Sequence, residues 1–210
     1  MVRKLLRKEA RHRMLIWEMG VRKGTAQVGP SNVADYRIDQ ELDGTPHIDS
    51  WHQLSCTRPK GFRSKKLTDV VQFAPGIHYA LSKREVEALY DLIKDDAELL
   101  PIKVDDRDYW LMHVTTILDC VDYERSEFQL FPDGRIASFD AVSFKPRQIA
   151  GHNVFKTSDS PLGFLYTSNV FKERVESIDK IGPYFMLAWD SERSKPIEIS
   201  LLDRLGASES

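Results

Sequence analysis

The chain has 210 residues, of which 41% are hydrophobic and 30% charged, and its formal net charge is −2 at pH 7. This length corresponds to one large or two small domains, which can bury a core without metal ions or disulfides. Only two cysteines occur, so a disulfide scaffold is excluded, and no apolar run approaches the ~18 residues of a membrane span.

The charge is divided unevenly along the chain. Residues 1–66 contain 14 lysines and arginines against 7 aspartates and glutamates, whereas residues 67–210 contain 16 against 25. The N-terminus is basic and lacks the apolar segment of a secretory signal. We therefore expect a cytoplasmic protein without a membrane partner, with a basic first third and an acidic remainder.

The predicted organisation is a basic arm over residues 1–13, a single domain over residues 14–190 and a polar tail over residues 191–210. In the arm, like charges four residues apart, such as Arg3 and Arg7, oppose helix formation. We expect the arm and the end of the tail to be loose, because little in either can be buried.

In the first third of the domain, the sequence predicts short strands and turns. Residues 14–17 form the first apolar segment and predict a strand. Glycines and prolines punctuate residues 20–76 every few positions, which favours short strands and turns over helices. Residues 70–73 predict one of these strands.

Two amphipathic helices are predicted, over residues 82–95 and 168–179. Ser82 and Glu85 form a capping box at the start of the first, and Ser168 caps the second. Each helix then carries apolar residues at the spacing of one helix face. These residues are Val86, Leu89, Tyr90 and Ile93 in the first helix, and Phe171, Val175 and Ile178 in the second.

Two hairpins and several further strands are predicted around these helices. One hairpin turns at the polar residues 105–108, and the other turns at the Pro-Asp-Gly sequence of residues 132–134. Strands are expected at residues 99–104, 109–114, 128–131, 135–139, 142–145, 154–156 and 184–189. The predicted fold class is α+β, with a mostly antiparallel sheet and two clear amphipathic helices.

Candidate metal ligands occur in one segment. His47, His52 and Cys56 are spaced by five and four residues, with Asp43 and Asp49 nearby. Because glycine and proline interrupt this segment, helical ligand spacing does not apply, and loop residues with ordinary polar contacts are the favoured interpretation. We expect no metal ion and no cofactor.

No nucleophile motif is present: the sequence contains neither a G-x-S-x-G elbow nor a phosphate-binding G-x-x-x-x-G-K-[ST] loop. Cys120 lies among apolar residues, which suits a buried and inert thiol. No catalytic residue is predicted, although a small enzyme that uses the dispersed residues His113, His152 and Asp119 stays open as an alternative.

A nucleic-acid-binding module is a second alternative, because the first third is basic. The near-neutral net charge of the whole chain and the lack of a recognised nucleic-acid-binding module disfavour this alternative. The groups that would contribute are the basic N-terminal arm together with Arg58, Lys60, Arg63, Lys65 and Lys66, with Trp51 and Phe62 nearby.

The order of segments between residues 78 and 189 resembles a known bacterial family. The segments that carry the resemblance are Ala80-Leu81-Ser82-Lys83-Arg84, Leu99-Leu100-Pro101-Ile102, Tyr109-Trp110-Leu111-Met112-His113-Val114, Ile117-Leu118-Asp119-Cys120-Val121-Asp122, Phe131-Pro132-Asp133-Gly134-Arg135-Ile136, Phe144-Lys145, Phe155-Lys156 and Ser168-Asn169-Val170-Phe171-Lys172. They resemble immunity family eleven of the polymorphic toxin systems, a family first catalogued as a domain of unknown function.

The resemblance implies a non-catalytic protein that binds and neutralises a cognate toxin in the cell that produces it. It implies no catalytic residues, and a homo-oligomer is left open. Because residues 67–210 are acidic, we expect acidic loops with an exposed aromatic residue to bind the toxin. The predicted partner-binding residues are Asp105, Asp106, Asp108, Asp122, Tyr123 and Glu124.

Overall fold

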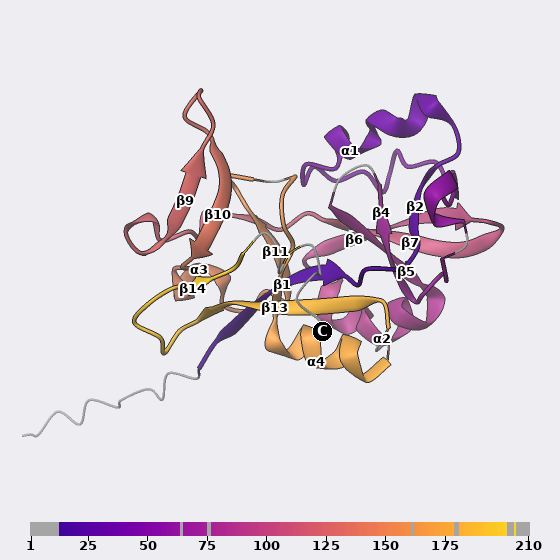
Figure 1. The fold of residues 1–210 in the computed structure, drawn as a ribbon. Helices are drawn as coiled ribbons and strands as arrows, with labels where there is room; N and C mark the ends of the chain where they lie inside the picture. The colour runs from indigo at the N-terminus through magenta and orange to yellow at the C-terminus, as the bar shows by residue number, and fades with distance from the viewer. Residues whose placement is uncertain are drawn as a thin grey trace, which may run out of the picture.

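A computed structural model describes residues 13–63, 65–74, 77–160, 162–178, 181–200 and 204. Most of the predicted N-terminal arm and most of residues 201–210 lie outside these described residues. Arg13, the last residue of that arm, is described, and its Nη2 lies 2.6 Å from Oδ2 of Asp190. The strands form a closed barrel, a five-stranded sheet and a three-stranded sheet (Figure 1).

The barrel closes in the order β2-β3-β6-β7-β5-β4. Four of its six pairings are antiparallel, whereas β3 pairs with β6 and β2 with β4 in parallel. Apolar residues of alternate positions fill its interior, among them Phe73, Leu100 and Leu111, all with 0% exposure. The strands are β2 (Gln27–Pro30), β3 (Leu54–Thr57), β4 (Val70–Phe73), β5 (His78–Ser82), β6 (Ala97–Val104) and β7 (Arg107–Val114).

The five-stranded sheet joins both ends of the described chain. Its order is β13-β1-β12-β11-β8, and only β11 and β8 are parallel. Phe144 packs edge-on against the rings of Phe155, Tyr166 and Trp189, which makes an aromatic core under this sheet. The strands are β1 (Leu15–Val21), β8 (Ile117–Leu118), β11 (Val154–Thr157), β12 (Tyr166–Ser168) and β13 (Pro183–Asp190).

The three-stranded sheet has the order β14-β10-β9, so β9 is an edge strand. It consists of β9 (Glu127–Leu130), β10 (Ile136–Val142) and β14 (Ile197–Glu198), all antiparallel, with two register shifts between β9 and β10. The β9–β10 hairpin projects from one end of the molecule, opposite the hairpin of β6 and β7 (Figure 1).

The two predicted helices are present as α2 (Lys83–Ile93) and α4 (Asn169–Ile178), which lie side by side below the strands (Figure 1). The side-chain oxygens of Ser82 and Ser168 accept hydrogen bonds from the backbone N–H groups of Glu85 and Phe171, three residues further along, as caps do. The architecture is mainly β with a closed barrel, which agrees with an α+β class.

The prediction for residues 20–76 is wrong at one point. Residues 33–41 form a 3₁₀ turn, η1 (Val33–Arg37), and a short helix, α1 (Ile38–Glu41), where strands and turns were expected. Asn32 caps the turn by accepting from the backbone N–H of Ala34. The remaining short elements are η2 (Lys60–Phe62), η3 (Tyr123–Arg125) and α3 (Pro146–Ile149).

The buried carboxylate of Asp96 joins the barrel to the five-stranded sheet. Asp96 lies in the turn between α2 and β6, and its side chain is 5% exposed. Oδ1 accepts from Nδ1 of His152 at 2.7 Å and from the hydroxyl of Thr116 at 3.0 Å. Oδ2 accepts from the backbone N–H groups of Asn153 at 2.7 Å and Val154 at 3.3 Å, at the start of β11. One side chain therefore fixes three segments of the chain.

Replacing Asp96 by asparagine tests this role. The variant places an amide donor among four donors, so we expect Asp96→Asn to lower the free energy of unfolding by about 3 kcal/mol. The neighbouring Asp95 is exposed, and Asp95→Asn is expected to change it by less than about 0.5 kcal/mol. Urea denaturation measures both values, and equal effects of the two substitutions would contradict the assignment.

Candidate functional site

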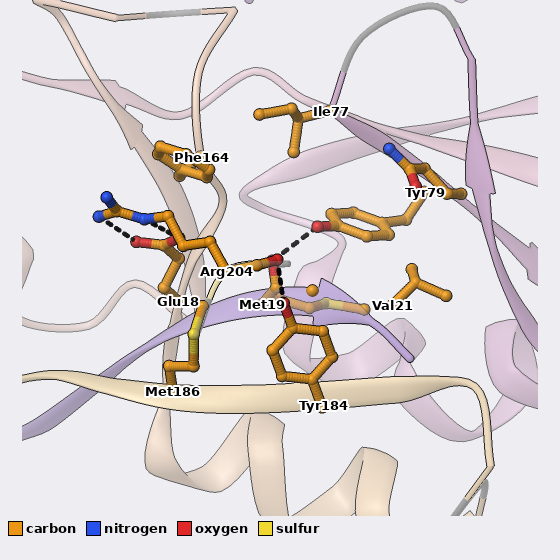
Figure 2. Close-up of a pocket in the computed structure, with 11 residues that line it drawn as sticks. Glu18, Met19, Val21, Ile77, Tyr79, Phe164, Tyr184, Met186 and Arg204 are labelled. Atoms are coloured by element: carbon orange, nitrogen blue, oxygen red, sulfur yellow. Dashed lines mark hydrogen bonds and ion pairs between the residues drawn. The ribbon is translucent and has the colours of Figure 1, made fainter. Parts of the chain in front are cut away.

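A cavity of about 120 Å³ lies between β1, β13 and the barrel (Figure 2). Its charged groups are Glu18 on β1, which is 1% exposed, and Arg204 near the C-terminus. Nε and Nη2 of Arg204 donate to the two carboxylate oxygens of Glu18 at 2.8 and 3.1 Å, a two-pronged ion pair. The guanidinium also lies 4.5 Å from the ring centre of Phe164 and donates to the carbonyl of Phe139.

Burial raises the pKa of the Glu18 carboxyl, and the ion pair with Arg204 opposes that rise. The two tyrosines of the cavity also bond within the fold. The Tyr79 hydroxyl donates to the carbonyl of Met19 at 2.6 Å, and the Tyr184 hydroxyl donates to the carbonyl of Arg204 at 2.5 Å. Together with the ion pair, these contacts hold Arg204 against β1 and β13, so the cavity is a structural junction between distant parts of the chain.

The three residues of the dispersed-enzyme alternative each bond to a different group. Nε2 of His113 donates to the carbonyl of Thr45 at 2.8 Å, and burial lowers the pKa of this histidine. His152 donates to Asp96, as described above. Asp119 is exposed and lies 3.5 Å from Nζ of Lys145. Within the described residues, no hydrogen bond or ion pair links the three side chains.

The candidate metal ligands do not gather either. His47 contacts the carbonyl of Glu41 through Nε2, whereas Cys56 is buried in the barrel wall. In the part of the chain that the structure describes, no three His, Cys, Asp or Glu side chains are placed to hold one ion. Burial raises the pKa of the thiols of Cys56 and Cys120 to about 12, so both are neutral and poor nucleophiles at pH 7.

Lys156 on β11 is an isolated buried charge. The residue is 3% exposed, and its ammonium group has no ion pair or hydrogen bond within the described residues. Burial lowers the pKa of Lys156 to about 8, because the charged form loses hydration without gaining a partner. This lysine therefore reduces the stability of the fold while it stays protonated.

The first predicted acidic cluster is the turn between β6 and β7. Asp105 and Asp106 have positive φ angles of 45° and 67°, as a tight two-residue hairpin turn requires. Asp105 Oδ2 lies 2.7 Å from Nε of Arg58, and Asp108 Oδ1 lies 2.8 Å from Nζ of Lys103. Two of the three carboxylates are therefore neutralised by cations of the same chain. Arg58, one of the basic residues considered for nucleic acid, is engaged in this contact.

The second predicted cluster lies beside β9. Tyr123 is 40% exposed, packs edge-on against Phe128 at 6.1 Å, and donates its hydroxyl proton to Oδ1 of Asp159 at 2.5 Å. Asp122, which precedes η3, and Glu124 within it flank Tyr123 and have no ion-pair partner within the described residues. The structure does not bring the two clusters together, since the β6–β7 turn and β9 lie at opposite ends of the molecule (Figure 1).

Sequence analysis missed two exposed apolar residues at the end of β9 away from this second cluster. Leu130 at the end of β9 is 55% exposed, and Phe131 in the following turn is 48% exposed, with the guanidinium of Arg135 5.6 Å from its ring centre. The alternating sequence of residues 128–131 predicts a strand with one buried face. It does not show that this strand lies at the edge of a sheet, with one hydrogen-bonding side unpaired, or that its last residue is exposed.

The comparison with known families concerns this same region. Residues 102–191 match the family model described as the Immunity protein family (Imm11). The resemblance to an immunity family is thereby confirmed over these residues. The Imm11 match contains β7 to β13, and with them both predicted acidic clusters and the β9–β10 hairpin. No curated protein matches the chain. None of the described helices has the length and apolar character needed to cross a membrane.

The Glu18–Arg204 pair predicts a large effect of removing one partner only. Arg204→Met leaves a buried carboxylate without its cation, so we expect the free energy of unfolding to fall by about 3–5 kcal/mol. The double variant Glu18→Gln/Arg204→Met removes both charges and is expected to recover most of this loss. Chemical denaturation measures the cycle, with the exposed Arg147→Met as control. Additive losses in the double variant would contradict a coupled pair.

Because burial lowers the pKa of Lys156, we expect the stability of the protein to depend on pH. Its pKa falls from an ordinary value of about 10.5 to about 8 on folding, so between these values the unfolded chain binds more protons and stability rises with pH. Lys156→Met should stabilise the protein by on the order of 3 kcal/mol at pH 7, and this gain should vanish as the pH approaches 10.5. Urea denaturation at several pH values tests this, with the exposed Lys94→Met as control. A gain that stays constant with pH would refute the explanation.

Proposed function

We propose that this chain is a cytoplasmic immunity protein that neutralises a cognate bacterial toxin by binding it. The observation that carries the proposal is the match of residues 102–191 to the Imm11 immunity family. Neutralisation by binding requires an exposed surface and no reaction. The partner is a toxin domain made in the same cell, and the bound protein blocks its active site or a motion that its activity needs.

The arrangement of polar groups supports a binding role. Candidate reactive side chains are engaged in the fold: His152 bonds to Asp96, His113 bonds to Thr45, and the thiol of Cys120 is buried with a raised pKa. Two exposed large apolar side chains, Leu130 and Phe131, in contrast, follow each other in the β9–β10 hairpin within the matched region. Partly apolar surfaces with aromatic anchors are typical of protein–protein interfaces.

Co-expression tests this function. The chain is produced in bacteria together with the toxin domain encoded next to its gene, and growth is followed after induction of the toxin. We expect the chain to restore growth and to form a stoichiometric complex in calorimetry, because binding removes the active toxin from the cell. Cells that carry an unrelated protein in the same vector serve as control. Growth arrest in the presence of an equal amount of folded chain, with no complex formed, would refute the proposal.

A further inference from the structure

We propose that the toxin binds at the free edge of β9, where an extended and basic toxin segment adds a fourth strand to the β14–β10–β9 sheet. This inference rests on the proposed function and names the surface that performs it. Three observations support it: the open hydrogen-bonding edge, the apolar side chains beside it, and the unpaired carboxylates that flank it.

The outer edge of β9 offers backbone groups to a partner strand. β10 pairs with one side of β9, and no strand of the described chain pairs with the other. Phe131 N–H donates to the carbonyl of Arg135 at 2.8 Å, so its backbone turns toward β10. Because neighbouring residues of a strand point their N–H and C=O groups to opposite sides, those of Leu130 turn outward. An added strand receives its main-chain hydrogen bonds there.

The sequence of β9 does little to prevent such pairing. Exposed edge strands are commonly protected by lysine, by proline or by a covering segment. Residues Glu127–Leu130 contain neither lysine nor proline. The two register shifts of this hairpin lie in β10, where the pairing skips Ala137 and Asp140. They leave the outer side of β9 uncovered.

Apolar anchors lie beside the edge. Leu130, Phe131 and Tyr123 are each 40% or more exposed. Tyr123 is already held in place by its contact with Phe128 and its hydrogen bond to Asp159. An aromatic side chain that is ordered before binding loses little conformational freedom in the complex, which favours affinity.

The charge at this edge specifies a basic partner. Asp122, Glu124 and Glu127 have no ion-pair partner within the described residues, whereas Asp133 pairs with Arg135. Arg125 donates to the neutral carbonyls of residues 193 and 194 and keeps its positive charge. Three carboxylates against one guanidinium leave this edge net negative. Lysines or arginines of the toxin strand would neutralise the unpaired carboxylates and speed association.

Two other assignments are disfavoured. At the β6–β7 turn, Arg58 and Lys103 already neutralise two carboxylates, which leaves less charge for a partner. A second copy of this chain that paired through β9 would bring the same three unpaired carboxylates, Asp122, Glu124 and Glu127, to this edge, so like charges would oppose a dimer.

The test compares variants of the full chain in calorimetric titration with the toxin domain. Leu130→Pro removes the outward N–H and should weaken binding by at least about 30-fold. Glu124→Lys/Glu127→Lys should weaken binding about tenfold and reverse its salt dependence, because attraction becomes repulsion. Glu41→Lys/Asp95→Lys reverses two exposed charges away from β9, so it is the matched charge control and should leave the affinity unchanged.

Circular dichroism and thermal unfolding confirm that each variant is folded, and the charge variant decides the question if Leu130→Pro does not fold. If the wild-type chain binds the toxin and the β9 variants bind equally well, the edge assignment is overturned while the proposed function stands. If the wild-type chain does not bind, the function itself fails. A wild-type dimer in sedimentation that Leu130→Pro dissociates would overturn the assignment in favour of a second copy.

Discussion

The carboxylate of Asp96 sets the relative position of the barrel and the five-stranded sheet. It accepts hydrogen bonds from the segment that leaves β7 and from the segment that enters β11, while its own backbone begins β6. A buried carboxylate is stable only when donors surround it, so these segments must meet at this point. The Glu18–Arg204 pair repeats the principle between β1 and Arg204. Buried charge thus specifies how the separate β structures are joined.

The β9–β10 hairpin extends from these joined sheets, and much of it is exposed to solvent. Phe139 of β10 is buried against the aromatic core, and Phe128 of β9 is half-buried on it, whereas the residues that follow in β9 and its turn are exposed. A rigid base with an exposed edge suits recognition of another chain, because binding then requires little ordering. The same region lies within the match to the immunity family.

Local signals in the sequence predicted local structure. Serine caps and the apolar spacing located α2 and α4, and turn residues located the β6–β7 and β9–β10 hairpins. Closure of the barrel was not predictable in this way, because the parallel pairing of β3 with β6 joins Leu54 to Ile102, far apart in the chain. The acidic residues near the candidate site could be identified from the sequence. Which of them form ion pairs could not, because Arg58 and Asp105 pair across 47 positions. The exposure of Leu130 could not be predicted either, because it depends on the order of the strands in the sheet.

The most direct test of the β9 assignment is site-resolved amide hydrogen exchange of the chain with and without bound toxin domain. A new strand at the edge of β9 hydrogen-bonds the outward N–H of Leu130, so we expect this amide to exchange much more slowly in the complex. The amides of the β6–β7 turn should exchange at the same rate in both states. Protection of that turn, with no change at Leu130, would show that the toxin binds elsewhere than at β9.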